Sequence, residues 1–331
     1  MPNAANTTQV TRGYAIAVIS AVFLSTTAIF IRYLTQEFQL PALVLAFWRD
    51  VFVALTLVIS LSLLRPALLR VQHRHLPYLL GYGLALACFN AFWTLSVALN
   101  GASVATVLVY CSAAFTALLG WWILREPLGW GKLLAVALSL GGCSLVAEAL
   151  DPTIWRANLP GILTGIFAGL MYAVYSLMGR SAAQRGMNPW TTLLYTFAFA
   201  AGFLLLGNLL PGGPLPGSAK VPADFFWLGS HLTAWIVLLL LAAGPTVAGF
   251  GLYNVSLSYL PSSVANLIAT MEPAFTAVIA YALFGERLKA VQIVGSIMIM
   301  GAVVFIRLYE SWTTRQEARA NKETTTAVFT D

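Results

Sequence analysis

Long apolar runs separated by short polar connections follow one another along almost the whole chain. Each run holds about 20 residues, the length that a helix needs to cross the hydrocarbon core of a bilayer. Ten such runs are predicted as spanning helices, at about residues 13–34, 41–64, 76–99, 102–124, 130–149, 159–180, 189–210, 233–256, 262–284 and 289–308. The pattern therefore predicts an all-α integral membrane protein with ten transmembrane helices.

Composition agrees with this fold class. Charged residues make up only 9% of the 331 residues, whereas an ordinary soluble domain carries about 25%. The pI near 9.3 does not indicate a nucleic-acid partner, because the basic residues lie mostly in the short connections between apolar runs. The expected surroundings are a lipid bilayer.

The distribution of Lys and Arg predicts the direction of insertion. With the N-terminus inside, twelve basic residues lie on the inner face and five on the outer face, and Arg49 remains within a span. The positive-inside rule then places both termini in the cytoplasm. Residues 309–331 are polar and are predicted to form a mobile cytoplasmic tail.

One stretch of the sequence occurs twice at a constant offset of 160 residues. GASVATVLVYCSAAFTALLGWWILREPL at 101–128 corresponds to PSSVANLIATMEPAFTAVIAYALFGERL at 261–288. Five spans in each half is an odd number, so the second half enters the membrane from the opposite side. The sequence thus predicts two inverted five-helix repeats, at 13–149 and 159–308, a plan typical of secondary transporters.

These two segments resemble the signature segments of the EamA-type transporters of the drug/metabolite transporter superfamily, and AFWRDVFVAL in span two is similar to the family's aromatic-Arg segment. The resemblance implies ten helices around a central cavity that opens alternately to each side. It also implies export of small metabolites, with amino-acid exporters of the YddG type as the nearest comparison. Ala113 departs from the family pattern, which often has proline there, whereas Pro273 is present in the second repeat. The two halves are therefore expected to bend differently.

Glu272 is the sharpest candidate for a substrate-binding residue. It lies ten residues into span nine, about 15 Å from the inner surface and hence near the bilayer midplane. An ionisable residue at that depth usually faces a cavity or a partner. Arg49 lies at a similar depth in span two. The residues leave three roles open for Glu272: binding an amine, titrating a proton, or forming a fixed pair with Arg49. Arg49 itself is a candidate for gripping a substrate carboxylate.

Polar and aromatic residues at similar depth are predicted to complete a substrate pocket, although helix packing is the alternative for each aromatic residue taken alone. The further candidate site residues are Ser25, Asn90, Trp93, Tyr110, Tyr172 and Tyr175. Gly244-Pro245 predicts an interruption of span eight, either a hinge or a static kink. Glu126 and Glu286 lie at helix-end turns and are interpreted as structural.

No enzyme motif or cofactor motif stands out. The sequence has no HExxH zinc motif, phosphate-binding loop or GxSxG elbow, and no metal or cofactor is expected. The favoured hypothesis is a secondary transporter of small organic metabolites, with amino acids as the leading class, in an inner membrane. The alternatives are a flippase or transporter for lipid-linked metabolites or organic cations, and a membrane-embedded enzyme. The sequence leaves the oligomeric state undetermined.

Overall fold

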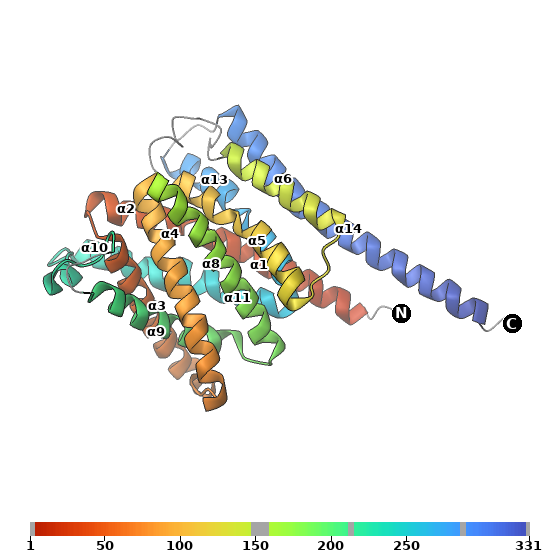
Figure 1. The fold of residues 1–331 in the computed structure, drawn as a ribbon, viewed down its shortest axis with the longest axis horizontal. Coiled ribbons are helices and arrows are strands. Elements are labelled where there is room, and N and C mark those ends of the chain that lie inside the picture. The colour runs from red at the N-terminus through yellow and green to blue at the C-terminus, as the bar shows by residue number, and fades with distance from the viewer. Residues whose placement is uncertain (1–3, 147–158, 211–214, 285–288, 329–331) are drawn as a thin grey trace.

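The structure is a computed structural model that describes residues 4–146, 159–210, 215–284 and 289–328 (Figure 1). Its regular elements in those ranges are helices: α1 Ala4–Leu24, α2 Thr27–Glu37, α3 Ala42–Leu64, α4 Leu76–Tyr110, α5 Ser112–Leu124, α6 Trp130–Val146, α8 Leu159–Gln184, α9 Pro189–Asn208, α10 Leu232–Leu241, α11 Val247–Tyr259, α12 Ser262–Ala269, α13 Glu272–Phe284 and α14 Ala290–Val328. Short 3₁₀ turns cover Pro66–Leu69, His73–His75 and Pro222–Phe226, and a π turn covers Ala242–Thr246.

The apolar length of these helices suits a bilayer. Six helical stretches in the described residues are long and apolar enough to cross a membrane, among them Gln9–Glu37 and Leu232–Tyr259. Three shorter apolar helices lie at Leu108–Leu124, Trp130–Leu145 and Ile293–Ile306. Large apolar side chains such as Leu63, 78% exposed, cover the outside of the bundle, where lipid would solvate them. The predicted all-α membrane fold is confirmed.

Helix α4 covers Leu76–Tyr110 as one element, yet residues far apart along it lie close together. In a straight helix Trp93 and Tyr110 would be about 25 Å apart. Both instead line one cavity, and Gly165 of α8 lies against both Ser96 and Leu108. The chain therefore folds back between residues 96 and 108, where the predicted spans 76–99 and 102–124 meet.

Four spans are interrupted rather than continuous. α1 gives way to α2 at Ser25-Thr26, and the π turn Ala242–Thr246 separates α10 from α11. Pro245 lies inside that π turn, so the predicted interruption of span eight is confirmed. The other two interruptions separate α4 from α5 at Cys111 and α12 from α13 at Thr270-Met271.

The last two interruptions are equivalent in the two repeats. Cys111 and Met271 are separated by the repeat offset of 160 residues. Both halves break at this position although Ala113 replaces the proline that Pro273 provides in the second repeat. The expectation that the two halves bend differently stays a prediction, since the shared position does not define the angle of either bend. The halves do differ at another span, where α1 gives way to α2 but the equivalent α8 is continuous over Leu159–Gln184. Proline is not what fixes the position.

The two halves pack helix against equivalent helix. α6 lies beside α14 along one edge of the bundle, and α3 packs on α9 (Figure 1). α1 packs on α11, and α4 packs on α8. These two contacts are equivalent, because spans one and three of the first half correspond to spans six and eight of the second. Such reciprocal pairing is what a two-fold relation between two five-helix units produces.

The C-terminal segment differs from the tail expected at 309–331. α14 continues from the membrane-spanning part as one helix to Val328. The stretch RQEARANK at 315–322 consists largely of strong helix formers, which favour continuation of the helix. The segment is therefore helical as far as Val328, and the mobility expected for residues 309–331 stays a prediction.

Close contact between α6 and α14 depends on Gly142. A Cβ atom at this position would lie 2.7 Å from the carbonyl oxygen of Gly295 and 3.1 Å from the amide nitrogen of Ile299. Because both are backbone atoms, Gly142→Val should destabilise the protein by about 1–3 kcal/mol. Thermal unfolding in detergent measures the loss. At neighbouring Gly141 the nearest atom is the flexible Met298 Cε at 3.4 Å, so Gly141→Val is the matched control and should change stability less.

Candidate functional site

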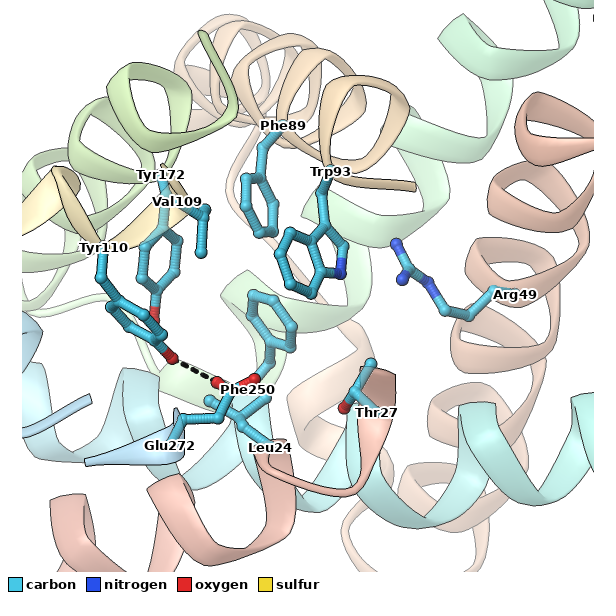
Figure 2. Close-up of a pocket in the computed structure, with 10 residues that line it drawn as sticks. All are labelled: Leu24, Thr27, Arg49, Phe89, Trp93, Val109, Tyr110, Tyr172, Phe250 and Glu272. Carbon is cyan, nitrogen blue, oxygen red and sulfur yellow. Dashed lines mark hydrogen bonds between the residues drawn. The ribbon is translucent and has the colours of Figure 1, made fainter. Parts of the chain in front are cut away.

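A small cavity lies between the helices of the two halves (Figure 2). Helices α1, α2, α3 and α4 of the first half supply side chains to its wall, and so do α8, α11 and α13 of the second half. The lining residues are Leu24, Thr27, Arg49, Phe89, Trp93, Val109, Tyr110, Tyr172, Phe250 and Glu272. The wall is therefore aromatic and aliphatic with a small number of polar groups, as in many small-molecule sites.

Five of the eight predicted site residues line this cavity. They are Arg49, Trp93, Tyr110, Tyr172 and Glu272. Ser25, Asn90 and Tyr175 are fully buried but lie outside the lining. The structure thus brings together residues that are far apart in the sequence, and their role in binding is taken up below.

Glu272 is the first residue of α13, immediately after the interruption at Thr270-Met271. Its side chain is only 8% exposed, and it accepts a hydrogen bond from the hydroxyl of Tyr110. Tyr110 ends α4 at the equivalent interruption of the first half. The two broken spans therefore present a carboxyl and a phenol to each other at the cavity wall.

Arg49 lies across the cavity from Glu272 (Figure 2). Its side chain is 1% exposed, and its Nε lies 3.5 Å from Oδ1 of Asp50. Its Nη2 has no hydrogen-bond partner. Within the residues that the structure describes, no ion pair joins Arg49 to Glu272, so the alternative of a fixed pair between them is wrong for this structure. The cavity separates the two groups and keeps both available.

Asn90 contacts Asp50 instead of the cavity. Its Nδ2 donates to Oδ1 and Oδ2 of Asp50 at 2.9 and 2.7 Å. Asp50 is fully buried, and it contacts Arg49 as well as Asn90. Sequence reasoning did not assign this role, because helix neighbours such as Arg49 and Asp50 point about 100° apart and adjacency alone does not indicate a contact.

Tyr175 belongs to a buried polar layer beside the cavity. Asn254 Nδ2 donates to the Tyr175 hydroxyl at 2.7 Å, and the Tyr82 hydroxyl donates to Asn254 Oδ1 at 3.1 Å. Neighbouring hydrogen bonds connect both halves through Ser112, Ser176, Tyr253 and Asn266. A second, smaller hollow is lined by Asn254 together with Gly179, Ala182, Ala183, Met187, Pro189 and Thr192. Asn254 therefore belongs both to the polar layer and to the wall of this hollow.

Ser25 lies in the interruption between α1 and α2, where its hydroxyl donates to the carbonyl of Val22 at 2.6 Å. Thr27, two residues further along, lines the cavity instead. Phe89 and Phe250 line the cavity as well but were not among the predicted site residues. Phe89 stacks on Tyr172 with ring centroids 5.0 Å apart, and Phe250 contacts Phe89 at 6.2 Å. In so apolar a chain, the sequence around a buried Phe does not distinguish a residue that lines a cavity from one that packs in the core.

Glu126 joins the two halves at the start of α12. Its Oε1 accepts from the backbone N–H and the hydroxyl of Ser262 at 2.8 and 2.7 Å, and its Oε2 accepts likewise from Ser263 at 3.3 and 2.7 Å. Lys132 Nζ donates to the Ser263 hydroxyl at 2.9 Å. We call these four residues the Glu126 clasp. A carboxylate that satisfies amide N–H groups at a helix N-terminus has the structural role expected for Glu126; Glu286 lies outside the described residues.

The clasp predicts a pH-dependent stability. Burial raises the pKa of Glu126, but the hydrogen bonds from Ser263 and Ser262 outweigh it and bring the pKa below its ordinary value of 4.5. The ionised carboxylate therefore stabilises the fold at pH values above about 4.5, and this contribution is lost as the pH falls through the lowered pKa. Thermal unfolding of Glu126→Gln in detergent should give a lower midpoint than wild type at pH 7. The two midpoints should converge toward pH 3, and a constant difference would contradict the prediction.

Comparison with known proteins gives a consistent result. The EamA-like transporter family model matches residues 11–147 and again residues 159–308. The chain is similar to a probable amino-acid metabolite efflux pump of Salmonella typhimurium, with 25% identity over 86% of this chain and 90% of that protein. It is also similar to the threonine/homoserine exporter RhtA of Escherichia coli, with 25% identity over 80% and 81%. A transporter of Archaeoglobus fulgidus is 25% identical over 88% and 95%.

A solved crystal structure has the same fold. It superposes with a TM-score of 0.69 and covers 90% of this chain and 98% of its own, at 14% sequence identity. At that identity the likeness concerns the fold alone. It agrees with the bundle of broken helices described above.

Proposed function

Because the chain belongs to the EamA-like transporter family, we propose that it moves a small amino acid across the membrane through the cavity between its two halves. The family and the relatives are transporters, and the chain is accordingly a multi-pass membrane transporter and not an enzyme. The substrate, the direction and the mechanism are the parts that we propose.

The observation that carries the proposal is the separation of two opposite ionisable groups by one cavity. Arg49 and Glu272 both line it, are both buried, and have no direct bond to each other in the described residues. A zwitterion with its carboxylate at Arg49 and its amine at Glu272 would give Glu272 an opposite charge. It would also give Arg49, which already contacts Asp50, a second carboxylate partner. Burial of a charge is tolerated when it is paired and hydrogen-bonded.

The neighbouring residues suit these two roles. The unpaired Nη2 of Arg49 offers an N–H donor to a carboxylate, with the planar geometry that guanidinium groups use for this purpose. Tyr110 donates to Glu272 and leaves the rest of the carboxyl group free to accept from an amine. Trp93 and Tyr172 supply aromatic wall on which an aliphatic side chain packs. Asn90 positions Asp50, and we assign Ser25 and Tyr175 to the framework of the site.

Alternating access is the mechanism that these features favour. With the predicted orientation, the cavity lies near the midplane, and the polar layer and the Glu126 clasp lie on its cytoplasmic side. Opening toward the cytoplasm would then separate the halves at the Ser112–Asn266 hydrogen bond and at the clasp, with the broken spans as flexible points. Export from the cytoplasm is the direction that the named relatives suggest. An inner-membrane location with both termini in the cytoplasm completes the proposal.

The alternative substrates make different demands on the site. A flippase for lipid-linked metabolites would need a cluster of basic residues for a phosphorylated headgroup, whereas Arg49 is the basic residue among those lining this cavity. An organic cation would be repelled by Arg49 as well as attracted by Glu272. A zwitterionic amino acid needs no cluster of basic residues, and it presents an opposite charge to both Arg49 and Glu272.

Counterflow in proteoliposomes tests the proposal. Purified protein is reconstituted, the vesicles are loaded with an unlabelled amino acid, and uptake of the same labelled amino acid is measured against protein-free vesicles. The proposal expects saturable uptake for at least one small neutral amino acid. Uptake confined to organic cations, or movement of a fluorescent lipid between leaflets without amino-acid uptake, would favour the alternatives instead.

A further inference from the structure

Three consecutive hydroxyl residues lie where the first span changes from α1 to α2, and one of them differs from the other two. Ser25 donates to the carbonyl of Val22 at 2.6 Å, and Thr26 donates to the carbonyl of Phe23 at 2.8 Å. Each of these two hydroxyls thus donates a hydrogen bond to a backbone carbonyl one turn earlier, as serine and threonine commonly do in membrane helices. Thr27 makes no such bond, and its Oγ1 has no hydrogen-bond partner.

Thr27 is buried at the cavity wall. Its side chain is 5% exposed, and it lines the cavity together with Arg49 and Glu272. In the view of Figure 2 it lies between these two residues. The described residues contain five buried side-chain polar atoms without a partner, and the two that belong to the cavity wall are Thr27 Oγ1 and Arg49 Nη2. A buried polar atom left unpaired is unfavourable, so each of the two calls for a partner that enters from the cavity.

We infer that Thr27 is a specificity-determining residue, whose hydroxyl hydrogen-bonds a hydroxyl or other small polar group on the side chain of the substrate. The inference rests on the proposed function, in which Arg49 takes the carboxylate and Glu272 takes the amine. A third hydrogen-bonding group between them would contact the side chain of the substrate, which is the part that differs from one amino acid to another. An apolar side chain in the same place would leave the Thr27 hydroxyl unpaired, and sites of this kind discriminate strongly against the analogue that lacks the polar group.

Two pairs of amino acids isolate the contact, because their members differ only by a hydroxyl in place of a methyl group. Threonine is compared with valine, and homoserine with norvaline, by calorimetric binding or by competition in counterflow with the full-length protein. Wild type should favour the hydroxyl member of at least one pair by about tenfold, the factor that one buried hydrogen bond supplies. Thr27→Val should abolish that preference, and Thr27→Ser should keep it.

Thr94 provides a matched control. Its Oγ1 is also buried and unpaired, it follows Trp93 on α4, and it does not line the cavity. Thr94→Val should therefore leave the ratio between the two members of each pair as it is in wild type. A ratio in Thr27→Val equal to that of wild type would overturn the inference, as would equal binding of both members by wild type. If wild type binds none of the four amino acids but takes up another small neutral amino acid in counterflow, the role of Thr27 fails and the proposed function stands. If it takes up no amino acid at all, the proposed function fails and the role of Thr27 fails with it.

Discussion

Glu272→Gln is expected to lower the affinity for an amino acid by about 10- to 100-fold, because a hydrogen bond to a charged group contributes about 1.5–3 kcal/mol. The substitution keeps the shape of the side chain and an oxygen that can accept from Tyr110. It removes only the negative charge that we assign to the amine. Binding is measured calorimetrically on purified protein, and counterflow should fall with it.

A ligand that lacks the amine is the control for Glu272. Valine and 3-methylbutanoate share a carboxylate and a side chain, so the second compound reports on everything except the amine. Glu272→Gln should weaken valine binding and leave 3-methylbutanoate binding nearly as in wild type. Equal losses for both ligands would mean that Glu272 holds the fold of the cavity and does not meet the amine.

Arg49→Gln is expected to have the second large effect, on both binding and stability. It removes the proposed carboxylate partner, and it also leaves Asp50 buried beside Asn90 without a cation. Breaking one side of a buried pair commonly destabilises a protein by about 3–5 kcal/mol. Thermal unfolding in detergent should therefore show a large drop for the single variant, together with loss of amino-acid uptake.

The double variant Arg49→Gln with Asp50→Asn separates the two effects. It removes both charges of the pair, so most of the lost stability should return while amino-acid binding stays weak. The loss in binding should be large for valine and small for valinol, which lacks the carboxylate. Uptake at the wild-type level by the double variant would show that Arg49 serves only the fold.

The fold was largely predictable from the sequence because hydrophobic length and a duplicated segment both constrain it. The ten apolar runs correspond to helices in the described residues, with α12 and α13 together covering the ninth, and Pro245 lies in a π turn. The breaks at Ser25-Thr26 and Cys111 were not predicted, because neither carries proline. The helical continuation to Val328 was also not predicted, because the residues after 308 are polar, although many of them are strong helix formers.

The site was predictable only in its ionisable and aromatic part. A charged residue in an apolar run is rare and conspicuous, and Arg49 and Glu272 both line the cavity. The predicted depth could not show which face of a helix a residue occupies. Asn90 and Tyr175 lie at a suitable depth but face Asp50 and Asn254, and Thr27 lines the cavity whereas Ser25 does not.

The separation of Arg49 from Glu272 has a consequence for energetics at the membrane. A zwitterion held between them carries no net charge, so its passage moves no charge through the transmembrane field. The field contributes about 2.3 kcal/mol per elementary charge per 100 mV, and a neutral cargo would not experience it. A voltage-dependent flux of a zwitterionic amino acid would thus report an ion travelling alongside it, and vesicles clamped with a potassium gradient and valinomycin can reveal that ion.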